Sequence, residues 1–167
     1  MQTISLPYGR GRVEAQIPDQ RLAAVLRSGA QSYRPQADQD QLVRQALENP
    51  IGTPPLRELA KGKHQVVIIS SDHTRPVPSK VILPQLVDEI RAGSPSAKIT
   101  VLVATGFHRP TTREEMLDKY GEELFLRSGL HFAVHLSGKD EDMVSLGTLP
   151  PGGKLLINKL AAQADLL

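Results

Sequence analysis

Two short segments that carry histidine and arginine nearly repeat each other, and each follows an apolar run. Residues 72–75, Asp-His-Thr-Arg, follow the run at 66–70, and residues 105–109, Thr-Gly-Phe-His-Arg, follow the run at 99–104. Histidine exchanges a proton near neutral pH, and arginine holds a carboxylate or phosphate through two parallel hydrogen bonds. These residue types predict a site that binds an acidic ligand and moves a proton on it.

Each candidate side chain has its own task in this interpretation. His108 is the candidate acid or base, Arg75 and Arg109 are candidate anion ligands, and Asp72 could accept from a ligand hydroxyl or orient a neighbouring histidine. A single loop of this kind is also explained by turn chemistry, with Asp72 as a turn acceptor and Arg75 in a surface ion pair. The second, matched loop favours the functional interpretation.

The elements that must position these loops alternate between strand and helix from Lys63 onward. Apolar periodicity predicts strands at 66–70, 99–104 and 130–136 and helices at 79–91 and 111–119. This alternation is typical of an α/β fold with a Rossmann-like, mainly parallel sheet and flanking helices. Ligands bind where the carboxyl ends of such strands meet, so we expect both loops to face one crevice.

The helix at 111–119 begins with two overlapping candidates for its N-terminal cap. Thr111 with Glu114, and Thr112 with Glu115, both have the spacing of a capping box. The sequence leaves open which of the two forms.

The first 62 residues have a different pattern and are interpreted as a hairpin and helical arm that packs on the core. Alternating runs at 3–7 and 12–17 flank a glycine-containing turn and predict a β-hairpin. Helices are predicted at 19–28, weakly, and at 38–48 and 56–60. The predicted division is therefore 1–62 for the arm and 63–167 for the α/β core.

The last part of the chain predicts short elements: strands at 144–146 and 155–157 and a helix at 158–164. Residues 164–167, Ala-Asp-Leu-Leu, resemble the start of a further strand, whereas chains usually finish in frayed polar residues. We therefore expect these 167 residues to be the front part of a longer protein that carries a second domain.

Composition disfavours several other classes of protein. The net charge is +2 with scattered basic residues, and aromatic residues make up only 4%, so a nucleic-acid-binding module is disfavoured. The chain has no cysteine, no signal-peptide pattern and no apolar run of membrane-spanning length, so a cytoplasmic protein without membrane partner is the expectation. His131 and His135 share one strand face, which a polar surface explains better than a metal site.

The two loops resemble the N-terminal signatures of the nickel-dependent lactate racemase family. The segments that carry the resemblance are Ser-Ser-Asp-His-Thr-Arg-Pro at 70–76 and Ala-Thr-Gly-Phe-His-Arg-Pro-Thr at 104–111. Asn-Pro-Ile-Gly-Thr-Pro-Pro-Leu at 49–56 and the ending from Ile157 to Leu166 are also similar to that family. The similarity runs from the opening hairpin to the last residue.

The resemblance implies a two-domain α/β enzyme that racemises or epimerises a 2-hydroxy acid. Its cofactor is a nickel pincer nucleotide, a pyridinium mononucleotide with two thiocarboxylate-type arms, which takes a hydride from the α-carbon and returns it to either face. His108 matches the first of two catalytic histidines. Asp72, His73, Thr74 and Arg75 match the cofactor-contacting segment, and Arg75 also lies near the substrate.

Several family residues have no counterpart in this chain. The second catalytic histidine, the lysine linked to the cofactor and the histidine that ligates nickel all fall beyond residue 167, so no metal ligand is assigned here. The isolated 167 residues are therefore expected neither to hold the nickel cofactor tightly nor to racemise a substrate. The alternative is a stand-alone α/β domain that binds a small anion or nucleotide without catalysis.

Overall fold

The structure is a computed structural model that describes residues 1–167, and the chain divides into two compact units, Met1–Gln36 and Ala37–Leu167. The first unit is an antiparallel hairpin of β1 (Gln2–Tyr8) and β2 (Gly11–Ile17), followed by the short turns η1 (Asp19–Arg21) and η2 (Gly29–Gln31). The predicted hairpin is confirmed.

The predicted helix at 19–28 is wrong. Only the single turn η1 forms there, and Leu26 is almost fully exposed. Short helices are marginal in water unless an apolar face is buried, and the larger apolar residues of this segment, Leu22, Val25 and Leu26, bury little surface.

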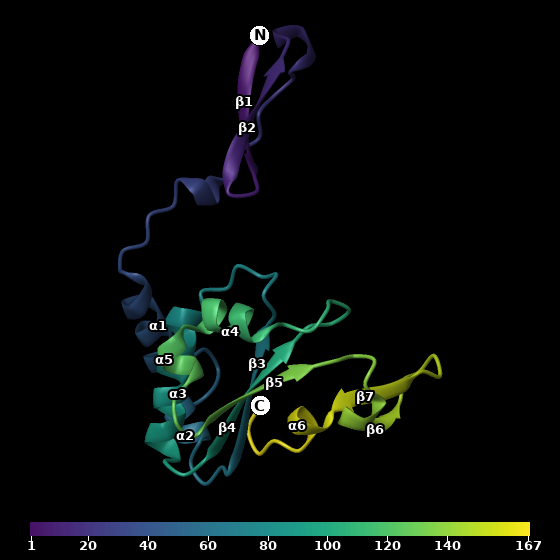
Figure 1. The fold of residues 1–167 in the computed structure, drawn as a ribbon. Helices are drawn as coiled ribbons and strands as arrows, with labels where there is room; N and C mark the ends of the chain where they lie inside the picture. Colours follow the sequence, from purple (N-terminus) through teal and green to yellow (C-terminus); the bar gives the residue numbers. More distant parts are fainter. The chain divides into compact units, whose positions relative to one another are not determined.

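The second unit is built on a parallel three-stranded sheet in the order β3-β4-β5 (Figure 1). The strands are β3 (Gln65–Ser71), β4 (Lys98–Ala104) and β5 (Leu130–His135). Ser71 is paired with Ala104, and Ala104 with His135, so all three strands end at one edge of the sheet. The α/β architecture predicted from the alternating pattern is confirmed.

Helices cover one side of this sheet in Figure 1. They are α1 (Gln39–Glu48), α2 (Leu56–Leu59), α3 (Ser79–Gly93), α4 (Arg113–Tyr120) and α5 (Glu122–Phe125). Helices α1 and α2 contact α3, so residues from 37 onward belong to the second unit, whereas the sequence places the division after residue 62. The packing of the hairpin on the core stays a prediction.

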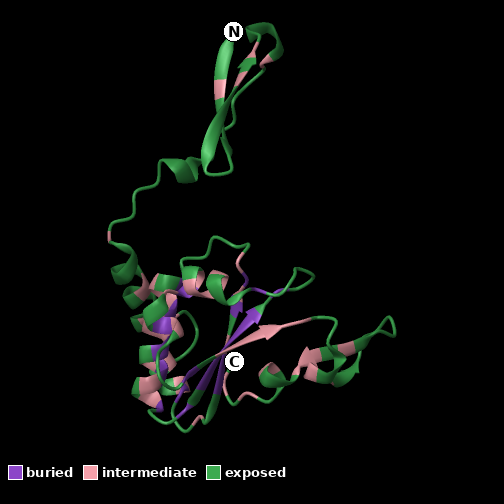
Figure 2. Cartoon of the chain, in the orientation of Figure 1, coloured by how far each residue is buried: buried purple, intermediate pink, exposed green.

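The core lies between the strands and these helices (Figure 2). Val101 and Val103 of β4 are fully buried, as is Tyr120 at the end of α4. The Tyr120 hydroxyl donates to the Ser70 Oγ at 3.1 Å, so the one large polar side chain in this core has a partner. This packing fixes the end of α4 relative to the end of β3.

A second hairpin follows β5 and lies on the other side of the sheet in Figure 1. It pairs β6 (Met143–Thr148) with β7 (Lys154–Asn158) and leads through α6 (Lys159–Ala162) back to the edge of β3. There Leu166 forms an isolated parallel bridge with Val66.

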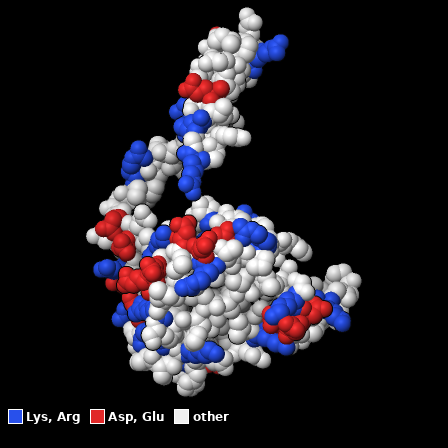
Figure 3. All heavy atoms as spheres, viewed as in Figure 1, with Lys and Arg blue, Asp and Glu red and all other residues white.

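Two surface features of the chain bear on its class. No helix combines the length and apolar character needed to cross a bilayer. On the face of the second unit that Figure 3 shows, acidic and basic side chains are interspersed, so that face carries no continuous basic surface.

Candidate functional site

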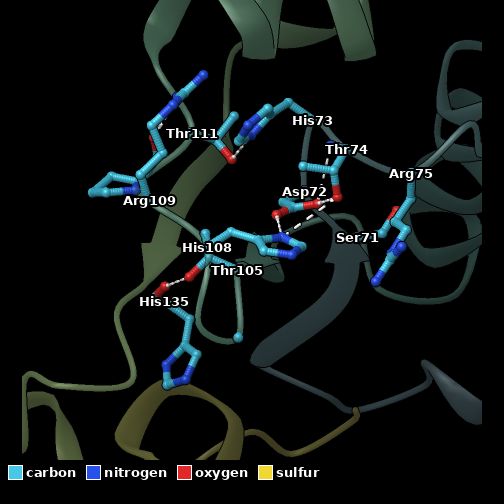
Figure 4. Close-up of polar contacts among 12 residues, drawn as sticks. Ser71, Asp72, His73, Thr74, Arg75, Thr105, His108, Arg109, Thr111 and His135 are labelled. Carbon is cyan, nitrogen blue, oxygen red and sulfur yellow. Dashed lines mark hydrogen bonds and ion pairs between the residues drawn. The ribbon is translucent and has the colours of Figure 1, made fainter.

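The two matched loops lie side by side at the carboxyl edge of the sheet. One loop follows β3 and leads to α3, and the other follows β4 and leads to α4. Gly106 turns the second loop back with φ +57°, and the His108 N–H donates to the Thr105 carbonyl at 2.9 Å. A residue with a side chain is strained at this φ, which explains the glycine. The turn aims His108 at the first loop (Figure 4).

Asp72 and His108 make the shortest contact between the loops. Oδ2 of Asp72 lies 2.5 Å from Nδ1 of His108, and Oδ1 accepts from the Thr74 hydroxyl at 2.7 Å and from the Thr74 N–H at 3.1 Å. The carboxylate is 2% exposed, whereas the His108 side chain is 43% exposed. The site therefore holds a buried acceptor behind an accessible imidazole.

The hydrogen bonds of Asp72 decide its protonation. Burial by itself would raise the pKa of the carboxyl, but the hydrogen bonds from Thr74 and His108 outweigh it and hold the pKa of Asp72 well below its usual range. An ionised carboxylate only accepts, so the neutral His108 carries its hydrogen on Nδ1. The lone pair is then on Nε2, which has no hydrogen-bond partner within the chain and can take a proton.

Arg75 carries an unpaired guanidinium at the carboxyl edge of the sheet. Its backbone N–H donates to the Asp72 carbonyl at 3.3 Å, and its own carbonyl accepts from the Lys119 ammonium at 3.0 Å. Its exposed guanidinium makes no hydrogen bond or ion pair within the chain. Together with His73 and Lys119 it lines a surface hollow beside the first loop. An unpaired guanidinium is available to an anionic ligand.

Arg109, the second predicted anion ligand, is engaged elsewhere. Its guanidinium makes two hydrogen bonds to the Glu115 carboxylate, at 2.5 and 2.9 Å. Of the one or two arginines expected at this crevice, only Arg75 therefore has an unpaired guanidinium, because the pair with Glu115 uses the donors of Arg109 that an anion would need.

The family model described as "Lactate racemase N-terminal domain" matches residues 8–167 of this chain. The chain belongs to this family. It is also 52% identical, over its full length, to a lactate racemase of Thermoanaerobacterium thermosaccharolyticum and 49% identical to one of Lactiplantibacillus plantarum. It spans 39% of the length of each of these relatives.

A solved structure agrees with this assignment. The structure of the lactate racemase apoprotein from T. thermosaccharolyticum matches 99% of this chain with a TM-score of 0.83 and 49% identity, and the match covers 38% of that protein. A Thermotoga maritima protein matches 73% of the chain with a TM-score of 0.52, and that match covers 29% of it. At 18% identity, the second likeness shows a shared fold alone.

Within this lactate racemase N-terminal domain, the sequence-selected residues fall into two groups. Asp72, Thr74 and His108 touch one another, and Arg75 leaves the same loop without a partner. His73 does not join them, because its ring turns toward α4, where Nδ1 lies 3.1 Å from the Thr111 hydroxyl. The first loop thus sends consecutive side chains to two places.

Sequence reasoning gave Thr111 and Glu115, two other residues near these loops, no role beyond a candidate helix cap. Thr111 binds His73, Glu115 binds Arg109, and the Ser71 Oγ is buried without a hydrogen-bond partner. The overlapping capping boxes were the only signal for the first two. Thr112 and Glu115 form the box in the structure, which frees the Thr111 hydroxyl for the other loop.

The two histidines of β5 make no hydrogen bond to Asp72 or His108. His135 Nδ1 lies 3.2 Å from the Asn158 Nδ2, and His131 is exposed. No group of three or more His, Asp or Glu side chains in this chain is arranged to hold a metal ion.

Proposed function

We propose that this chain is the cofactor-facing N-terminal part of an enzyme that racemises or epimerises a 2-hydroxy acid, and that His108 is one of its catalytic residues. The observation that carries the proposal is the Asp72–His108 pair, which gives a half-exposed histidine with a defined tautomer and an unpartnered Nε2. Membership of the lactate racemase N-terminal domain family supports the choice of reaction.

In the proposed reaction, the substrate's hydroxyl group faces Nε2 of His108. As the bond between the α-carbon and its hydrogen breaks with loss of a hydride, the hydroxyl proton moves to Nε2 and the carbon becomes a ketone. Asp72 stabilises the imidazolium that forms, as an ionised carboxylate does for a catalytic histidine. Return of the proton from Nε2 accompanies return of the hydride to either face, and the net change is inversion or retention at that carbon.

Arg75 is the proposed ligand of the substrate carboxylate. Its guanidinium has no partner in the chain, and it leaves the same loop as Asp72. A guanidinium that holds the carboxylate also lowers the energy of the negative charge that develops on the substrate oxygen. The same segment, Asp72 to Arg75, is proposed to contact the cofactor.

The residues of this edge fit the polar part of a nickel pincer nucleotide, which would supply the hydride acceptor when bound. The Ser71 Oγ is buried without a partner and the Arg75 guanidinium is free, so a polar ligand at this edge would satisfy both. No nickel ligand is proposed among residues 1–167, because the family resemblance implies that the histidine that ligates nickel falls beyond residue 167.

The test is made on the whole protein, loaded with its cofactor, with D-lactate or L-lactate and chiral detection of the product. His108→Ala is expected to lower kcat by at least about 10²-fold, the usual contribution of a general base. His131→Ala removes an exposed histidine of β5 and is expected to leave kcat unchanged.

Two results would contradict the proposal. Full activity of His108→Ala would remove His108 from catalysis. A wild-type whole protein that binds small anions but racemises no 2-hydroxy acid would instead support the alternative of an anion-binding domain.

A further inference from the structure

Glu115, in the first turn of α4, collects contacts from the loop that carries His108. Both oxygens of its carboxylate accept from the Arg109 guanidinium, at 2.5 and 2.9 Å, and Oε2 also accepts from the Thr112 N–H at 2.9 Å. Helix α4 ends in the fully buried Tyr120, so it is anchored in the core. These contacts therefore tie the residue next to His108 to a fixed element.

His73 ties the other loop to the same place. Its side chain is 17% exposed, and Nδ1 lies 3.1 Å from the hydroxyl of the buried Thr111 and 3.7 Å from Oε2 of Glu115. Figure 4 shows the ring of His73 beside Thr111, while Asp72 turns the opposite way, toward His108. Asp72 and His73, adjacent in the first loop, thus contact the second loop at two residues, His108 and Thr111.

We infer that His73, Arg109, Thr111 and Glu115 form a loop clamp that positions the His108 imidazole against Asp72. His108 lies between the clamp and the turn at Thr105, whose carbonyl accepts its N–H, so its backbone is held on both sides. The members of the clamp are positioning residues. The inference rests on the proposed function, because a fixed ring matters most if that ring moves a proton.

Helix capping alone does not explain these contacts. A capping box needs only Thr112 and Glu115, and both of its hydrogen bonds are present. Arg109 lies outside the helix and His73 lies on another loop, yet both approach the same carboxylate. An exposed ion pair adds at most a small amount to stability. The added contacts fix a geometry, and misplacing a reacting group by about 1 Å can cost about 10²-fold in rate.

The chain offers a matched control for breaking the clamp. Arg57 of α2 and Glu89 of α3 also form a two-bond arginine–carboxylate pair, with side chains 52% and 18% exposed against 58% and 27% for Arg109 and Glu115. The control pair joins two helices away from both loops.

The experiment compares Arg109→Ala and the milder Arg109→Lys with Arg57→Ala in the whole, cofactor-loaded protein. Arg109→Ala is expected to lower kcat about 10- to 100-fold with KM changed less than about two-fold, because binding groups are untouched. Arg109→Lys keeps the positive charge but lacks the planar guanidinium that makes two parallel hydrogen bonds to Glu115, so an intermediate kcat is expected. Arg57→Ala is expected to leave kcat within about two-fold of wild type, since it acts on stability alone.

The contact between His73 and Thr111 is tested from the Thr111 side. Thr111→Ser keeps the hydroxyl that lies 3.1 Å from Nδ1 of His73 and is expected to retain most of kcat, whereas Thr111→Val removes the hydroxyl and is expected to resemble Arg109→Ala. In a double variant, Thr111→Val with Arg109→Ala, the loss of kcat is expected to be much smaller than the product of the two single losses, because both act through the position of one ring.

A readout that does not depend on turnover separates this inference from the proposed function. The His108 Nδ1 hydrogen, in a short bond to Asp72, is expected to give a low-field proton NMR signal. Arg109→Ala is expected to shift or broaden that signal, and Arg57→Ala to leave it in place. An unmoved signal together with wild-type kcat in Arg109→Lys and Arg109→Ala would overturn the clamp. A moved signal with activity that survives His108→Ala would keep the clamp and overturn the catalytic role.

Discussion

Asp72 and His108 stand 36 positions apart in the sequence, yet Oδ2 of Asp72 lies 2.5 Å from Nδ1 of His108. The contact joins the ends of two neighbouring parallel strands and is continued by the two hydrogen bonds from Thr74 to Oδ1 of Asp72. It leaves Nε2 as the one unpartnered nitrogen of the His108 ring.

Replacing Asp72 by asparagine is expected to lower kcat of the whole protein by about 10²- to 10⁴-fold, since an amide can hold the imidazole in the wrong tautomer. Steady-state racemisation at several pH values measures the effect, with Asp140→Asn, in the exposed turn η3, as the control. If Asp72→Asn kept the wild-type kcat, the carboxylate would have no part in setting the tautomer.

Loss of the Arg75 side chain is expected to weaken substrate binding in the whole protein and to change the free energy of unfolding little. Its guanidinium has no partner in the chain, so Arg75→Ala is expected to change the free energy of unfolding by less than about 0.5 kcal/mol. In the whole protein the same variant is expected to raise KM for the hydroxy acid at least about 10-fold, as loss of a charged hydrogen-bonding partner does. Arg44→Ala, on the exposed side of α1, is the control for both measurements. A large loss of stability without a change in KM would assign Arg75 a structural role.

Glu115 makes the stability of the protein depend on pH in the acid range. The Arg109 hydrogen bond, followed by the one from the Thr112 N–H, lowers the pKa of Glu115 to about 2, whereas an unfolded chain has a glutamate pKa of about 4.3. A carboxyl with a lowered folded pKa stabilises the protein fully above the unfolded pKa, and this contribution is lost as the pH falls toward 2.

Urea unfolding of the whole protein at pH 6, 4 and 3 checks this dependence. The wild type is expected to be more stable than Glu115→Gln at pH 6, and the gap is expected to shrink at pH 3. Glu123→Gln, at an exposed glutamate of α5, should run parallel to the wild type. A gap that grows with acidity would mean that the sign of the coupling is reversed.

Gly93 permits the close approach of α3 to α2. A Cβ on Gly93 would lie 2.0 Å from the Arg57 carbonyl oxygen and 3.0 Å from the Ala60 Cβ, and the first of these neighbours is backbone. Gly93→Ala is expected to destabilise the protein by about 1–3 kcal/mol or more, as overpacking does. Gly138→Ala, where nothing lies within 4 Å, should change stability by less than about 0.5 kcal/mol. Equal unfolding midpoints for the two variants in urea would contradict this account of Gly93.

Local patterns in the sequence were sufficient for most of the elements. The apolar runs at 66–70 and 99–104 and the spacing in 38–48 gave strands and a helix close to those observed, because strand and helix periodicity are set by residues a few positions apart. The helix predicted at 19–28 does not form, because burial does not support its weak apolar periodicity.

The carboxyl edge of the sheet as the place for chemistry was also predicted from sequence, since parallel strands that follow one another present their loops together. The sequence could not say which side chains of those loops meet. Asp72 and Arg109 are both polar loop residues, yet one reaches His108 and the other turns to Glu115. That choice depends on the strand register and on the position of α4, which are set by packing across the whole core.

The sequence by itself determined that this protein is an α/β chain with two matched, chemistry-bearing loops, and which residue types those loops carry. Only the tertiary structure decided that Asp72 fixes the tautomer of His108, that Arg75 stays free and that Thr111 binds His73 while Thr112 caps the helix. The physical reason is distance along the chain. Periodicity and turn chemistry act over a few residues, whereas hydrogen bonds across 36 or 38 positions exist only after the strands and helices have packed.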